Sequence, residues 1–162
     1  MTVELARAAW PEPGDTDLPA LAGFTVSSFS PLVAETADRC LTRWHGAAPL
    51  RGAGRTALVL VSSSGDVGTA RAVAGAVAAG RRVPPLLFFQ SNPNAVLGHI
   101  AARWLLTGPV VALGSGGEPA GRAEAELLLG GGEADLVLVV AAEQARTDRE
   151  RDRATAVLLG PA

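Results

Sequence analysis

Continuous apolar runs of strand length recur along this 162-residue chain, separated by polar or glycine-rich turns. Residues 56–61 (TALVLV) and 135–142 (DLVLVVAA) lack the alternation of a half-exposed strand, so they predict strands covered on both faces. The shorter runs 110–113 (VVAL) and 154–159 (ATAVLL) predict two more strands. Residues 21–28 (LAGFTVSS) and 86–89 (LLFF) are also apolar enough for short strands or extended pieces.

Helical spacing of apolar residues alternates with these runs. Ser30-Pro31 and Asn92-Pro93 each join a capping side chain to a proline suited to a first helical turn. Apolar stripes follow both starts, and small or apolar residues at 67–79 and 118–129 predict two further helices that glycines end. Strands that alternate with helices predict an α/β layered fold, with a mostly parallel sheet and helices packed on it.

The first 20 residues differ from the rest of the chain, because prolines and acids interrupt them. We interpret residues 1–20 as an N-terminal arm and residues 21–162 as one domain, long enough to bury a core. The arginine-rich, alanine- and glycine-rich composition is typical of a GC-rich bacterial genome.

Charge and composition exclude several classes of function. The chain has 14 basic and 16 acidic residues, and this net charge of −2 argues against a general nucleic-acid binder. One cysteine and two histidines allow no intrachain disulfide, thiolate cluster or histidine-rich metal site, and no cofactor is implied. No signal-peptide core and no run of about 18 apolar residues is present. We therefore expect a cytoplasmic protein with no membrane span.

Residues 86–142 resemble the ketosynthase branch of the thiolase-fold enzymes. The shared features are Asn94 near a helix start, the turn Leu106-Thr107-Gly108-Pro109 before a strand, and the turn Gly132-Glu133-Ala134-Asp135 before a buried strand. The resemblance implies a truncated, thiolase-like layered fold that corresponds to the N-terminal half of the family.

One departure from this family concerns its catalytic groups. The family's nucleophilic cysteine follows the Gly-Pro strand, but here that turn offers Ser115, Gly116 or Gly117. Cys40 falls on a predicted apolar helix stripe, which favours a packing residue. The family's catalytic histidines belong to its C-terminal half, and neither histidine here matches them. We therefore predict a catalytically inactive accessory protein of polyketide or fatty-acyl biosynthesis, without cofactor or metal.

The resemblance also implies partners. It predicts a homodimer, or a heterodimer with an active ketosynthase, formed through residues 109–113, and an acyl carrier protein as a further candidate partner. Candidate pocket or interface residues are Asn94, His99, Arg103, Trp104, Val110 and Val111.

Two alternatives stay open at this point. A serine on a glycine-rich turn could make the chain a small acyl-thioester hydrolase or transferase that uses Ser115, although no acid–histidine partner is evident. The loops Gly114–Gly117 and Ser62–Asp66 each follow a strand and precede a helix, a geometry that can bind phosphate through free amides. Both lack the complete nucleotide-binding motifs, so a nucleotide-binding α/β domain is the weaker alternative.

Overall fold

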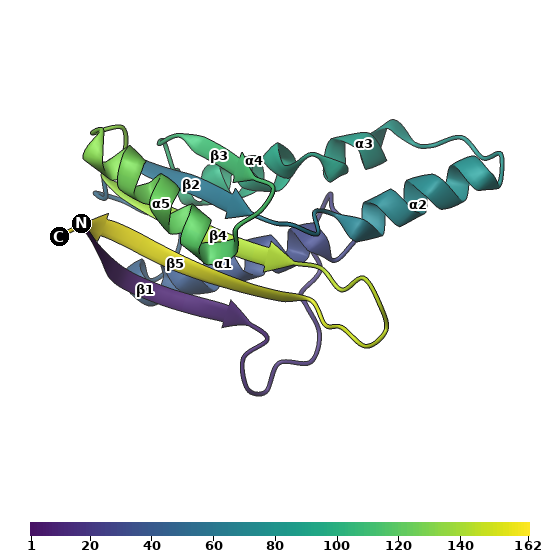
Figure 1. Ribbon diagram of the computed structural model, residues 1–162, viewed down its shortest axis with the longest axis horizontal. Helices are drawn as coiled ribbons and strands as arrows, with labels where there is room; N and C mark the ends of the chain where they lie inside the picture. The colour runs from purple at the N-terminus through teal and green to yellow at the C-terminus, as the bar shows by residue number, and fades with distance from the viewer.

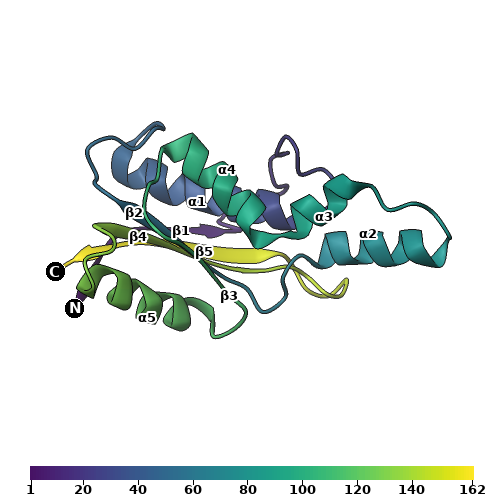
Figure 2. The same ribbon diagram turned by 90° about the horizontal axis from the view of Figure 1, so that it is seen from above.

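A computed structural model describes residues 1–162 as one mixed sheet with helices on both faces (Figures 1 and 2). The sheet has the order β1-β5-β4-β2-β3. Its strands are β1 (Thr2–Trp10), β2 (Thr56–Val61), β3 (Val110–Leu113), β4 (Leu136–Glu143) and β5 (Arg153–Pro161). β2 pairs in parallel with β3 and β4, whereas β5 is antiparallel to both β4 and β1. Four strands therefore run in one direction and β5 runs against them.

The helices divide into two covering layers and a projecting arm. They are α1 (Phe29–His45), α2 (Val67–Ala78), α3 (Pro85–Ser91), α4 (Pro93–Trp104) and α5 (Gly117–Gly130). Figure 2 shows α1 and α4 on one face of the sheet and α5 on the other, with α2 and α3 extending past its end. We call residues 67–91, which carry α2 and α3, the arm.

Alternating side chains of the buried strands fill two cores. Leu58 and Leu60 of β2 belong to the cluster under α1 and α4, while Val59 and Val61 belong to the cluster under α5. All six residues of β2 are buried, as its uninterrupted apolar run predicted. The α/β fold class with helices packed on the sheet is therefore confirmed.

The predicted start of α4 is confirmed, whereas α1 begins at Phe29 with Ser28 at its N-cap, so Ser30 lies inside the helix and no side chain caps it. Asn92 caps α4 by accepting a hydrogen bond from the Asn94 amide at 2.9 Å, and Pro93 occupies the first turn. On the predicted stripe of α1, Val33, Ala37 and Cys40 are buried, although Trp44 at its end is exposed.

The expectation of an N-terminal arm over residues 1–20 was wrong for its first half. Residues 2–10 form the edge strand β1, which pairs along its length with β5. Only Ala8 and Trp10 of β1 are buried, and the register shifts between Glu4 and Ala6, so the strand shows no clean alternation.

Two short apolar runs were also wrongly predicted as extended structure. Residues 21–28 contain a single bridge, between Leu21 and Phe24, and no strand. Residues 86–89 lie in α3, which Pro85 begins at its first position. A run of four apolar residues does not distinguish a strand from one helical turn, so the preceding proline was the better signal.

Candidate functional site

The turn between β3 and α5 holds Ser115, Gly116 and Gly117, the three positions that the resemblance aligns with the family nucleophile. Gly116 and Gly117 have φ angles of 94° and 59°, which favour glycine. A Cβ at Gly116 would lie 2.5 Å from the Cβ of Ala120, so the turn is also sterically restricted. Gly116 is the N-cap of α5, and no side chain, including that of Ser115, caps this helix.

Ser115 has none of the partners that activate a nucleophile. Its side chain is exposed and its hydroxyl makes no hydrogen bond. The His99 ring packs edge-on against Phe24, with 6.0 Å between ring centroids, and His45 Nε2 accepts from the Arg51 amide at 3.4 Å. An activated serine needs a base within hydrogen-bonding reach, and neither histidine is bonded to Ser115.

Cys40 is a packing residue, as its position on the α1 stripe predicted. Its side chain is fully buried in the core under α1 and α4. Burial raises the pKa of the thiol to about 11, which keeps it protonated at neutral pH.

The loop between β2 and α2 already holds an anionic group of the chain itself. The amides of Ser63 and Ser64 donate to the two carboxylate oxygens of Glu143, at 2.8 and 2.7 Å. Asp66 caps α2 by accepting from the Thr69 amide at 2.9 Å. An external phosphate would have to displace Glu143 from these amides, so the geometry does not favour the nucleotide-binding alternative.

A polar cluster behind this loop was not predicted from the sequence. The side-chain amide of Gln144 donates to the hydroxyls of Ser27 and Ser28, at 3.0 and 2.9 Å. These hydroxyls in turn donate to Asp66 and Asp152, each at 2.5 Å. We call these five residues the hub. Nothing local in the sequence indicates this cluster, because Gln144 contacts serines that lie more than 110 positions away.

Two grooves follow α4, and the predicted pocket residues of this helix line them. One groove, of about 250 Å³, lies between α1, α4 and residues 19–22, and Arg103 and Trp104 line it. The other, of about 470 Å³, lies between Phe24 and the helices α3 and α4, and Asn94 lines it. His99 borders both grooves. Four of the six predicted residues thus lie on one helix and line the grooves beside it.

Asp38 of α1 fixes two of these side chains. Its Oδ1 atom accepts from Arg103 Nε at 2.8 Å and from Trp104 Nε1 at 3.1 Å. Trp104 is buried, so this hydrogen bond satisfies an indole N–H that would otherwise be costly to bury. The contact therefore stabilises the packing of α1 on α4.

Val110 and Val111 lie apart from these grooves, on the edge strand β3. Only β2 pairs with β3, so its outer side has no neighbouring strand. Val110 is 46% exposed, whereas Val111 is half-buried and packs against the core under α5. Proline and charged residues, which usually protect an edge, are absent from the strand itself.

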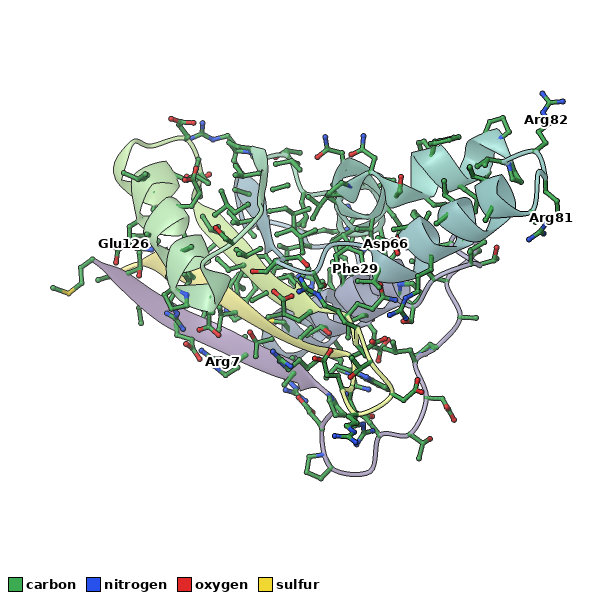
Figure 3. The ribbon with its side chains drawn as sticks, turned by 45° about the vertical axis from the view of Figure 1, so that its right-hand side comes forward. Arg7, Phe29, Asp66, Arg81, Arg82 and Glu126 are labelled. Atoms are coloured by element: carbon green, nitrogen blue, oxygen red, sulfur yellow. The ribbon has the colours of Figure 1, made fainter.

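The arm exposes apolar and basic side chains together. Its exposed large apolar residues are Val77, Leu86, Phe88 and Phe89. Arg81 and Arg82 lie at its tip, far from the sheet (Figure 3). No acidic residue occurs between Asp66 and Glu118, so the arm is positively charged although the whole chain is not.

An ion-pair cluster joins the start of α5 to β1. Glu118 accepts from Arg7 at 2.7 Å and from Arg122 at 2.8 Å, and the same two arginines bind Glu4. The hydrogen bonds from Arg7 and Arg122 lower the pKa of Glu118 to about 2. This cluster fixes the helix that follows the candidate turn.

No group of three or more histidine, cysteine or acidic side chains is arranged to hold a metal ion. None of the helices has the length and apolar character needed to span a membrane.

Comparison with known proteins identifies the fold. No family model and no curated protein matches the sequence. One chain of a ketosynthase (ApeO) in complex with its chain length factor (ApeC), from Xenorhabdus doucetiae, superposes with a TM-score of 0.69 at 22% identity, over 91% of this chain and 63% of that chain. A chain of the ishigamide ketosynthase/chain length factor superposes with a TM-score of 0.75 at 18% identity, over 99% of this chain and 62% of that chain. A β-ketoacyl-[acyl carrier protein] synthase III from Thermus thermophilus superposes with a TM-score of 0.54 at 21% identity, over 98% of this chain and 51% of that chain.

The chain spans less than two thirds of the length of each of these solved chains. The superpositions cover almost all of its own residues, including the segment 86–142 on which the resemblance was based. This chain therefore has the thiolase-type fold of the ketosynthases and chain length factors, over part of their length.

Proposed function

We propose that this protein is a non-catalytic, ketosynthase-like accessory subunit of polyketide or fatty-acyl biosynthesis that works in the cytoplasm by associating with an active ketosynthase. The observation that carries the proposal is the unpaired apolar edge β3 beside the exposed apolar arm. Two of the matched structures are described as a ketosynthase with a chain length factor, and we transfer that mode of association to this chain.

The edge strand supports association because its free backbone groups can pair with another strand. Val110 is exposed on β3, Leu105 is 57% exposed just before it, and Phe88 and Phe89 are exposed on the neighbouring arm. α4 packs against both β3 and α3, so it connects these two surfaces. Exposed apolar side chains in such number indicate a protein–protein contact.

The candidate catalytic turn supports a non-catalytic role. Ser115 is exposed without a base, the only thiol is buried on another helix, and no cysteine occupies the turn that precedes α5. The alternative of a hydrolase or transferase that uses Ser115 therefore has no geometric observation in its favour.

The tip of the arm supports an acyl carrier protein as a further partner. Arg81 and Arg82 are exposed there, and the nearest acidic residues in the sequence are Asp66 and Glu118. Such a local excess of positive charge attracts an acidic protein surface and speeds its association.

Co-expression with candidate ketosynthases tests the association. We expect a 1:1 complex in size-exclusion chromatography with light scattering, and Val110→Asp should abolish it because a charge would be buried in the new strand pair. Val3→Asp is the matched control, since Val3 is 43% exposed on the opposite edge strand β1. A complex that survives Val110→Asp, or that Val3→Asp disrupts equally, would contradict this placement.

A further inference from the structure

The arm is held to the body of the molecule mainly at its base. The only helix or strand that α2 packs against closely is α3, and only Thr69 and Ala76 of its residues are buried. Figure 1 shows both helices projecting beyond the end of the sheet. The arm therefore meets the body at two places, the first turn of α2 and the packing of α3 on α4, and the first of these contributes to its direction.

Gln144 joins that first turn to the ends of two other elements. Its side-chain amide donates to Ser27 and Ser28 before α1, while its side-chain carbonyl accepts from the Gly68 amide of α2 at 3.0 Å. Gln144 itself directly follows β4 and is only 8% exposed. One buried side chain thus connects α1, α2 and β4, and all its polar atoms are hydrogen-bonded.

Steric contact at Gly68 fixes the same joint. A Cβ at this position would lie 2.8 Å from the Cβ of Ser27 and 3.1 Å from its Cα. These distances are too short for any side chain, so α2 approaches the start of α1 at a separation that only glycine permits. Figure 3 shows the two helix starts close together, marked by Asp66 and Phe29.

We propose that Gln144 and Gly68 are positioning residues that set the angle at which the arm leaves the body. Asp66 contributes to the same joint, because it binds Ser27 and caps α2. The position of Arg81 and Arg82 then depends on a joint at the opposite end of α2. This positioning role is inferred from the contacts of Gln144 and Gly68 alone. Its effect on the binding of a carrier protein to Arg81 and Arg82 rests on the function proposed above.

Spin labels on Arg82→Cys and Glu126→Cys measure this angle by pulsed electron paramagnetic resonance. Both positions are exposed, one at the tip of the arm and the other on α5, whereas Cys40 is buried and stays unlabelled (Figure 3). We expect a narrow distance distribution in the otherwise wild-type chain. Gly68→Ala should shift this distribution and roughly double its width, because α2 must move away from Ser27.

Gly75→Ala is the matched control, because the same substitution on the same helix meets no atom within 4 Å. Gln144→Met provides a second test that removes the hydrogen bonds at similar side-chain volume, and it decides the matter if Gly68→Ala does not fold. Its control is Ser63→Ala, whose backbone amide still binds Glu143. An unchanged distance distribution in Gln144→Met would overturn the proposal.

Affinity for a purified acyl carrier protein, measured with the same variants, separates the two claims. If both are correct, Gly68→Ala and Gln144→Met weaken binding about tenfold, or 1.4 kcal/mol, while Gly75→Ala does not. If the distances change but the affinity does not, the positioning role stands and the proposed docking of a carrier protein on the arm is wrong.

Discussion

At the scale of single residues, burial and hydrogen bonding decide which side chains are chemically active. Cys40 is the only thiol, yet it is fully buried and its pKa is raised to about 11. Ser115 has the opposite environment, since it is exposed but has no hydrogen-bond partner. The chain therefore places one nucleophile out of reach and leaves the other unactivated.

The environment of Cys40 gives a direct prediction. The folded protein should react with Ellman's reagent at pH 8 at least about 100-fold more slowly than the unfolded chain, because the thiolate is scarce and access requires opening of the core. Stopped-flow absorbance measurements with and without urea give the rates of thiol modification in the unfolded and the folded chain. Rapid reaction in the folded state would show that Cys40 is not a packing residue.

Glu118 predicts a pH dependence of stability. Its pKa is about 2 in the folded protein and near 4.5 without its arginine partners, so its stabilising contribution is complete above pH 4.5 and is lost as the pH falls through 2. Glu118→Gln should lower the free energy of unfolding by about 1 kcal/mol at pH 7, and this difference should shrink toward pH 2. Urea titrations at several pH values measure it, with Glu126→Gln on the exposed side of α5 as the control. A difference that stays constant with pH would show that the ion pairs with Arg7 and Arg122 contribute nothing.

At the scale of elements, the sequence predicted buried structure better than edges. β2 and β4 carry apolar runs on both faces, and the start of α4 has a cap and a proline, so all three were recognisable. β1 was missed because a half-exposed edge strand with a bulge has no regular pattern, and its strand pairing with β5 spans nearly the whole chain. The hub was missed for the same reason, since its contacts join distant segments.

The arm carries a prediction of its own. Replacing Arg81 and Arg82 together by glutamate should weaken the binding of a purified acyl carrier protein at least about tenfold at low salt, and the loss should diminish as salt rises. Isothermal titration calorimetry at two salt concentrations measures this. The control variant replaces Arg149 and Arg151 by glutamate, since both are exposed in the loop between β4 and β5. Equal losses in both double variants would show that the net charge matters and not the arm.

At the scale of the whole molecule, exposed large apolar side chains are most concentrated on the arm, with Leu105 and Val110 at and just before β3. The opposite edge strand β1 also exposes Val3 and Leu5, but there they alternate with the ion-paired Glu4 and Arg7. This concentration supports the partner contact proposed at the β3 side. The fold could be recognised from residues 86–142 because its motifs are local in the sequence, whereas the exposed apolar surface combines separate elements and is visible only in three dimensions.

The central proposal is that this chain acts as a partner of a ketosynthase and not as a catalyst. The measurement that tests it most directly is intact-protein mass spectrometry of the purified complex with its ketosynthase, after incubation with an acyl-pantetheine thioester. We predict one acyl adduct on the ketosynthase and none on this chain. An adduct on this chain that maps to Ser115 and disappears in Ser115→Ala would contradict the account and establish the chain as an acyl-transfer enzyme.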